Sequence, residues 1–475
     1  MDLEEITITA RDGDRVAVPV DQLSARLDGR LLRPGAAGWD DAVRIWNAMV
    51  AKTPALVVQP ETAHDVAATV DFARTHGLLL SIKGGGHHIA GVAVADGGIT
   101  VDMSRMSAVT VDPDARLAHV GPGCRLQDVD RATQEYGLAT PLGFISEVGA
   151  AGLTLGGGLG YLTRRFGWAV DNLEEVEIVT ADGRIHTASR EENAELFWAV
   201  RGAGANMGAV TRLTYRLHEV GPTVCGGLVA WPFEGAADIL RAYRSITAEA
   251  PRELAVWLLM LRAPAAPFVP PAWHGRRVCL MVVCFTGDLD DADQVLAPIR
   301  ALPDPVLSLL GPQPYTQIQS YLDITEPKGM HYYWKTGYLT DLSDGFLTTI
   351  RQLCAECPVP DAELGVLHLA GAINDRAPDD GAVGNRDARY VVGANGMWAP
   401  GDPDTDMYQA WIREAWRQIE PFTTGGSYIN FQTADEAEER IHATYGANLD
   451  RLVEAKTAYD PDNVFRCNRN IAPRR

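Results

Sequence analysis

The sequence predicts a globular protein of the α/β or α+β class. Three observations support this prediction. Short apolar runs alternate with helical patterns over roughly the first 140 residues, two stretches are rich in glycine, and a long central segment contains strand-like runs without comparable glycine loops. A length of 475 residues suits two to four domains or one large interleaved fold.

The elements expected in the N-terminal part follow one another at short intervals. Apolar residues at helical spacing, β-branched runs and turn residues locate them. In chain order, we expect a helix at 40–47, a strand at 55–58, a helix at 61–76, strands at 78–82, 98–102 and 115–121, and a helix at 125–137.

The central and C-terminal parts contain longer patterns. Residues 277–285 form a nearly continuous apolar run, which predicts a buried strand, and residues 408–419 have helical periodicity. Residues 427–431 alternate as a strand would, so we expect Tyr428 and Asn430 to lie on one face of it.

Composition excludes several classes of partner. The formal net charge of −20 argues against binding to nucleic acid or to anionic membranes. No run of 18 apolar residues predicts a membrane span, and the acidic N-terminus does not have the pattern of a signal peptide. Seven scattered cysteines fit free thiols in a reducing compartment, so we expect a cytoplasmic protein.

The first glycine-rich stretch directly follows the strand predicted at 78–82. Gly84, Gly85 and Gly86 leave successive backbone N–H groups uncovered, as in loops that bind a phosphate or pyrophosphate, and His87 and His88 come next. The P-loop and Rossmann fingerprints are both absent. No metal site is predicted, since adjacent histidines on extended backbone point to opposite faces and no further ligands follow at metal-binding spacing.

The second glycine-rich stretch covers residues 143–160. From Gly149 onward, eight of its 12 residues are Gly or Ala, so the backbone is expected to approach another group closely. A flexible linker is a poor explanation, because Val148, Leu153, Leu155 and Leu159 are interleaved with the glycines.

Five segments carry a resemblance to a known family. They are the Gly84–His88 stretch, the 143–160 run, Asp171 with Asn172, the segment 196–204 and the tail 459–466. Together they resemble the berberine-bridge-enzyme-like flavoproteins of the vanillyl-alcohol-oxidase superfamily, and most of all bacterial members such as the hydroxynicotine oxidases. The resemblance runs from about residue 40 to the C-terminus.

The resemblance implies an α+β fold in which a two-part, PCMH-type FAD-binding domain carries an inserted α+β substrate domain. The N-terminal part of the FAD-binding domain would cover residues 1–217 and its C-terminal part residues 425–475. The substrate domain, at 218–424, would be built on an antiparallel sheet that covers the flavin ring.

The resemblance also implies how FAD is held. In such proteins the histidine after the glycine loop is bonded to the flavin 8α-methyl, which corresponds to His87. Relatives with a second, cysteinyl link have it where this chain has Ile145, so a single covalent bond is expected. The expected cofactor-binding residues are His87, Lys83, Gly84, Gly85, Gly86, His88, Val148, Gly149, Gly152, Leu153, Gly158, Ile178, Asn430 and Asn468.

The implied reaction moves a hydride to flavin N5 from a C–H next to an OH or NH of a small organic substrate. The resemblance makes Tyr428 the best candidate for the base, with Asn395 and His368 as further catalytic candidates. Plant relatives have a Glu or Gln base where this chain has Gly393. A valine at the position of Val148 accompanies oxidases, so O2 is the expected electron acceptor and hydrogen peroxide the product.

Other functions stay open at this point. The same scaffold also supports flavin-dependent dehydrogenases and oxygenases of secondary-metabolite biosynthesis, and a covalent flavin-binding protein without turnover is a further alternative. A metal-dependent hydrolase using His87, His88, His64 and nearby acids is an alternative of another class.

Overall fold

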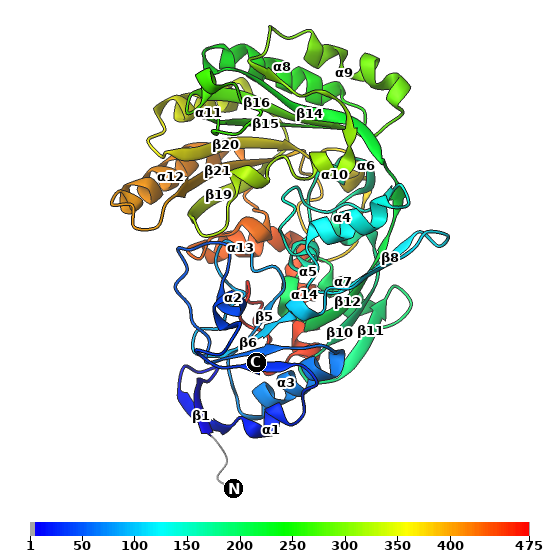
Figure 1. The fold of residues 1–475 in the computed structure, drawn as a ribbon, viewed down its shortest axis with the longest axis vertical. Coiled ribbons are helices and arrows are strands. Elements are labelled where there is room, and N and C mark those ends of the chain that lie inside the picture. The colour runs from blue at the N-terminus through cyan, green and yellow to red at the C-terminus, as the bar shows by residue number, and fades with distance from the viewer. Residues whose placement is uncertain (1–4, 475) are drawn as a thin grey trace.

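The structure, a computed structural model, describes residues 5–474 and has an α+β fold. In Figure 1, a large sheet with its helices occupies the upper half, and two smaller sheets lie in the lower half with the N-terminal segments. A hairpin of β1 (Glu5–Thr9) and β2 (Arg15–Pro19) begins the described chain.

The two smaller sheets differ in strand direction. The four-stranded sheet has the order β3 (Arg30–Leu32), β4 (Leu56–Gln59), β6 (Ile99–Asp102), β5 (Leu80–Lys83), with β6 parallel to both its neighbours. The five-stranded sheet is antiparallel, in the order β11 (Ile185–Ser189), β10 (Leu173–Val179), β12 (Ala209–Arg216), β8 (Leu117–Val120), β7 (Val109–Asp112).

Short helices connect and cover these sheets. They are α1 (Asp21–Ser24), α2 (Trp39–Val43), α3 (Ala63–Thr75), α4 (Leu126–Gln134), α5 (Ala150–Leu155), α6 (Thr163–Phe166) and α7 (Ala194–Val200). Helix α3 has a capping box, in which Thr62 accepts from the Asp65 N–H and the Asp65 carboxylate accepts from the Thr62 N–H. This cap satisfies backbone donors that the first turn leaves free, which fixes the start of the helix.

The large sheet has eight strands, all antiparallel. Its order is β17 (Leu307–Ser308), β14 (Thr223–Pro232), β16 (Arg277–Phe285), β15 (Leu254–Arg262), β20 (Asp361–His368), β21 (Tyr390–Trp398), β19 (His331–Leu339), with β18 (Gly311–Pro314) also pairing with β14. Its strands lie within residues 223–398; the domain boundaries at 217 and 425 stay a prediction.

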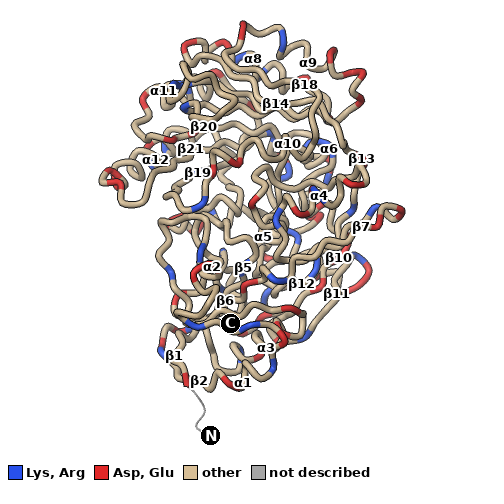
Figure 2. Tube along the Cα trace, viewed as in Figure 1, with Lys and Arg blue, Asp and Glu red and all other residues tan. Residues whose placement is uncertain are grey.

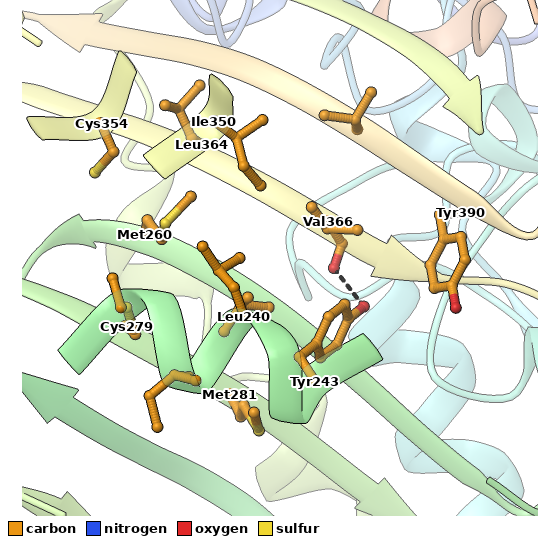
Figure 3. Packing of buried hydrophobic residues seen from close by; sticks show 14 of the residues in the cluster. Leu240, Tyr243, Met260, Cys279, Met281, Ile350, Cys354, Leu364, Val366 and Tyr390 are labelled. Atoms are coloured by element: carbon orange, nitrogen blue, oxygen red, sulfur yellow. Dashed lines mark hydrogen bonds between the residues drawn. The ribbon is translucent and has the colours of Figure 1, made fainter. Parts of the chain in front are cut away.

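One face of the large sheet is covered by four helices, α8 (Ala236–Glu249), α9 (Ala292–Arg300), α11 (Asp344–Glu356) and α12 (Thr405–Ile419). Because side chains alternate along a strand, every second residue joins this core. Leu258, Met260, Leu364 and Val366 do so, and all are nearly fully buried. Figure 3 shows Tyr243 of α8 among them, its hydroxyl donating to the Val366 carbonyl over 2.8 Å.

The opposite face of the large sheet points toward the lower half. Its buried apolar residues, such as Trp257 and Leu259, pack with Leu159 of the 143–160 run and with Tyr161, which directly follows it. In Figure 2, most charged residues lie in the loops and helices around the outside, and the strands of the large sheet carry few. Within its six long strands, acidic residues occur only on β20, at Asp361 and Glu363.

The C-terminal segment returns to the lower half after α12. Helices α13 (Glu438–Tyr445) and α14 (Leu449–Tyr459), drawn in orange and red in Figure 1, pass from the large sheet to the N-terminal segments. The ion pair of Lys456 with Asp460 is fully buried, and Lys456 also donates to the carbonyls of Asn206 and Phe465. These bonds fix the final segment against the earlier part of the chain.

Most expected elements are present with shifted ends, and two expectations are wrong. The helix expected at 40–47 ends at Val43, because Arg44 already has extended dihedrals. Residues 427–431 form no strand; Ile429–Phe431 is a 3₁₀ turn closed by a bond from the Phe431 N–H to the Tyr428 carbonyl. Along residues 5–474, no helix is both long enough and apolar enough to cross a membrane.

Candidate active site

The two glycine-rich stretches meet at one cavity between the sheets. This main cavity encloses about 1520 Å³, including the part open to solvent. Most of its lining comes from three parts of the chain, which are residues 82–93, residues 144–159, and a C-terminal group that includes Tyr428, Asn430 and Asn468. Residues between 203 and 210 and single residues such as Trp46, Glu326 and Trp334 complete it. Its walls combine bare backbone and apolar side chains with a few polar groups, which is the usual lining of a small-molecule or cofactor site.

Glycine is required where the two stretches touch. A Cβ on Gly85 would overlap the backbone of Gly149, and a Cβ on Gly149 would overlap the backbone of Gly85. By contrast, a Cβ on Gly152 would meet nothing, since this residue faces open space in the cavity. The glycines therefore serve two purposes, which are close approach of two loops and an uncovered cavity wall.

His87 and His88 both line the cavity but are held differently. The His88 ring accepts from the Ala90 N–H at Nδ1 and donates to the Ile429 carbonyl from Nε2, at 3.2 Å in each case. Within the described chain, the His87 imidazole has no recorded hydrogen bond, and it stacks on Trp46 with ring centroids 5.7 Å apart. Burial, aided by Lys328 and Arg125, lowers the pKa of His87 to about 3, so its ring is neutral with a free lone pair.

Most of the expected cofactor-binding residues line the main cavity. These are Gly84, Gly85, Gly86, His87, His88, Val148, Gly149, Gly152, Leu153, Asn430 and Asn468. Asn468 also leaves its buried Oδ1 without a partner, while its Nδ2 donates to the carbonyls of Ala205 and Phe465. An unsatisfied buried acceptor on a cavity wall is typical of a site that receives a hydrogen-bond donor from a ligand.

Three of the expected cofactor-binding residues do not line the cavity. Lys83 turns away from it, since its ammonium donates to the Ala42 carbonyl over 2.7 Å and lies 3.5 Å from Asp102. Ile178 is fully buried under Gly208, because inward-facing residues of β10 pack into the core. Gly158 instead donates its N–H to the Tyr428 hydroxyl.

Tyr428 lies on the cavity wall with its hydroxyl oxygen already bonded. This oxygen accepts from the Gly158 N–H at 3.0 Å and from Asn430 Nδ2 at 2.8 Å. Burial outweighs these two donors and raises the pKa of Tyr428 to about 12, so the side chain is a neutral phenol. The turn at 429–431 thus brings Tyr428 and Asn430 together, although they do not share a strand face.

His368 lies on the other side of the large sheet. Along β20 it shares the helix-covered face with Leu364 and Val366. It stacks on Tyr390, and its Nδ1 lies 3.0 Å from Nη1 of Arg164. His368 is therefore a structural residue in this arrangement.

A second, smaller cavity lies on the face of the sheet that is turned away from the helices, with about 470 Å³ of space including the part open to solvent. We call it the side chamber. It shares Phe144, Glu326, Trp334 and Phe431 with the main cavity, so the two adjoin. Its remaining wall comes from four strands and a loop, namely Leu259, Thr336, Glu363, Gly365, Leu367, Val391, Gly393 and Asn395 with Leu322 and Thr325.

Glu363 is the functional candidate that the sequence did not reveal. It stands on β20 directly opposite Asn395 of β21, whose Nδ2 lies 3.5 Å from its Oε1. Burial raises the pKa of Glu363 to about 7. Gly393 of β21 has no side chain, but Glu363 of the neighbouring strand β20 places its carboxyl group in the same chamber. A glutamate directly before the mostly apolar run from Leu364 to Leu369 was the available signal.

Metal chemistry finds no support in the side-chain arrangement. Across residues 5–474, no group of three or more His, Cys, Asp or Glu is arranged to hold a metal ion. His64, which a metal-dependent hydrolase would have used, is exposed on α3 and does not line the main cavity.

Comparison with known proteins agrees with this arrangement. The family model described as FAD binding domain matches residues 54–189, and the model described as berberine and berberine like matches residues 427–472. The first match contains the segments 82–93 and 144–159 that line the main cavity, and the second contains its C-terminal group with Tyr428, Asn430 and Asn468.

Whole-chain relatives cover nearly the full length. The chain is 29% identical to (R)-6-hydroxynicotine oxidase from Paenarthrobacter nicotinovorans, over 94% of this chain and 97% of that protein. It is 28% identical to an FAD-linked oxidoreductase from Dictyostelium discoideum, over 96% of this chain and 97% of that protein.

Solved structures have the same fold. The crystal structure of 6-hydroxy-D-nicotine oxidase from Arthrobacter nicotinovorans superposes with a TM-score of 0.85 at 27% identity, covering 94% of this chain and 98% of that one. A berberine-bridge-like protein from Physcomitrella patens also gives 0.85, at 24% identity, with 96% and 99% covered, which supports the fold. The chain is an FAD-dependent oxidoreductase that is similar, over nearly its whole length, to the berberine-bridge-enzyme-like FAD-linked oxidases.

Proposed function

We propose that this protein oxidises a small organic substrate by removing a hydride from a C–H next to an OH or NH, and that O2 is then reduced to hydrogen peroxide. The observation that carries the proposal is the junction of the two cavities. A wall of bare backbone with a neutral His87 leads into a chamber that contains a carboxyl group with a pKa near neutrality.

His87 is the proposed point of attachment for the flavin, through one bond from its imidazole to the 8α-carbon. The ring is neutral, makes no recorded hydrogen bond in the described chain and lies on the cavity wall. Ile145 also lines the cavity, at the position where a second, cysteinyl link would come from. When bound, FAD supplies a two-electron acceptor at N5 that O2 can reoxidise.

Glu363 is the proposed proton acceptor. A general base works best when its pKa is close to the working pH, and the burial of Glu363 gives it such a value. Asn395 donates toward the same carboxyl group and would orient it. Tyr428, a neutral phenol with two donors on its oxygen, is proposed as a polar contact of the bound ring system and as the alternative base.

Val148 supports O2 as the electron acceptor. Its side chain is one methylene smaller than leucine and lines the main cavity beside Gly149. Extra space on this wall would let O2 approach the cofactor. A dehydrogenase that uses another acceptor is the alternative within the same class.

The test begins with the purified protein. We expect a yellow protein whose colour stays with the polypeptide after acid denaturation, and peroxide formation during substrate turnover in air. His87→Ala should release the flavin into the acid supernatant, whereas His88→Ala should keep it bonded. A colourless protein from a riboflavin-replete host, or a bonded flavin in His87→Ala, would refute the attachment; reduction of the flavin by substrate without peroxide would identify a dehydrogenase.

A further inference from the structure

We propose that the substrate is an amine whose nitrogen is protonated in solution, and that this cationic nitrogen enters the side chamber between Glu326 and Glu363. The inference rests on the proposed function and specifies its substrate class. Two observations support it: buried polar atoms of the chamber have no hydrogen-bond partner, and the described lining contains no basic side chain.

Unpartnered hydrogen-bond acceptors line this chamber. Glu326 Oε2, Asn395 Oδ1 and Thr336 Oγ1 are buried and have no hydrogen-bond partner. Thr336 is only 3% exposed, and it follows Trp334 by two residues along β19, so both face the chamber. Buried polar atoms without partners are costly, and a ligand with several N–H donors would satisfy these three together.

The charges in the chamber favour a cation. Burial, with a smaller contribution from the charge of Glu363, raises the pKa of Glu326 well above its ordinary value. Among the described residues that line the chamber there is no Lys, Arg or His to compensate for them. A bound ammonium group would supply the missing counter-ion, which favours the ionised form of the carboxyl group that it approaches.

The rest of the wall suits an amine joined to an apolar group. Phe144, Trp334 and Phe431 lie where the chamber joins the main cavity, and Leu259, Leu367 and Val391 form the floor. Aromatic faces attract cations, and more so where water is excluded. A sugar would instead need polar partners around each of its hydroxyl groups, and most of the described lining is apolar.

The chemistry balances with the groups present. The bound ammonium first gives one proton to the Glu363 carboxylate, which leaves a neutral amine. The α-carbon then transfers its hydrogen with both bonding electrons to the flavin of the proposed function, and a carbon–nitrogen double bond forms. Water adds to the resulting iminium ion outside the chamber, giving a carbonyl compound and a free amine or ammonia.

The test compares binding of matched amine and alcohol pairs to the flavin-loaded protein by isothermal titration calorimetry. The probes are benzylamine with benzyl alcohol, phenethylamine with phenethyl alcohol, and N-methylbenzylamine with benzyl methyl ether. We expect at least one amine to bind 10-fold or more tightly than its neutral partner. Glu326→Gln should reduce that preference about 5- to 10-fold without weakening the neutral compound.

Controls separate this inference from the proposed function. Glu414→Gln removes an exposed carboxylate on α12 and should leave the preference unchanged. Thr336→Val should weaken amine binding a few-fold, because one acceptor is lost. Equal affinity for amine and neutral partner in every pair, or an unchanged preference in Glu326→Gln, would overturn the inference. A protein that still carries flavin and is reduced by an alcohol would contradict the amine class and keep the oxidase, whereas a flavin-free protein would contradict the oxidase itself.

Discussion

The two faces of the large sheet use the same strands for different purposes. On the face covered by α8, α9, α11 and α12, Met281, Leu364 and Val366 pack in an apolar core (Figure 3). On the other face, Glu363 and Asn395 leave space around them, and this space is the side chamber. Because side chains alternate along a strand, residues one position apart belong to a stabilising core or to a binding surface.

This comparison predicts that substitutions on one face of the sheet change stability and that substitutions on the other face change activity. A substitution toward the helices should change the free energy of unfolding with little effect on the chemistry. A substitution toward the chamber should change the chemistry without destabilising the fold, since a buried, unpaired carboxyl group does not contribute favourably to stability. Three experiments test this separation, from the largest expected effect to the smallest.

The largest effect is expected for Glu363→Gln. The amide keeps the shape of the side chain but cannot accept a proton, so kcat/KM should fall by roughly 10²–10⁴-fold, or about 3–5 kcal/mol of transition-state stabilisation. Steady-state kinetics under air would measure it, with Glu414→Gln as the matched control on the outside of α12. If Tyr428→Phe lost this much activity and Glu363→Gln lost little, Tyr428 would be the base.

Met281→Ala should have the next largest effect, on stability. The Met281 side chain is fully buried on the helix-covered face, and its removal leaves a cavity. Such truncations cost about 2–5 kcal/mol, which urea denaturation would measure. The flavin absorbance and kcat of the remaining folded protein should stay close to those of the wild type. A large loss of kcat at unchanged stability would contradict the division between the faces.

The smallest effect concerns pH. The folded-state pKa of Glu363 is raised from an ordinary value of 4.5 to about 7, so between these values the native protein holds more protons than the unfolded chain. Stability contributed through this group is therefore present at low pH and is lost as pH rises toward 7. Glu363→Gln should become more stable relative to wild type by on the order of 1–3 kcal/mol between pH 5 and pH 8.

Urea denaturation of both proteins at the two pH values would measure this difference. A stability difference that does not vary with pH would mean that the carboxyl group is ionised at low pH as well. In that case the raised pKa that makes Glu363 a suitable base at neutral pH would have to come from binding of the substrate.

Much of the fold follows from local patterns. The run at 277–285 is a strand with those bounds, and the helix patterns at 61–76 and 408–419 correspond to α3 and α12. The segment 427–431 shows where such reasoning fails. Alternation there resembles a strand, but no neighbouring strand pairs with it, and a hydrogen-bonded turn forms instead. The prediction that Lys83 binds the cofactor had a similar weakness. Its buried partners Ala42 and Asp102 come from distant positions in the sequence, so no local pattern shows them.

The sequence by itself determined the glycine-rich wall of the main cavity, since bare backbone next to a histidine is encoded in consecutive residues such as Gly85, Gly86 and His87. Only the tertiary structure decided the side chamber. Glu326, Thr336, Glu363 and Asn395 come from a loop and three strands, and strand register sets which of them stand opposite one another. Register depends on pairing between distant segments, which no local pattern specifies.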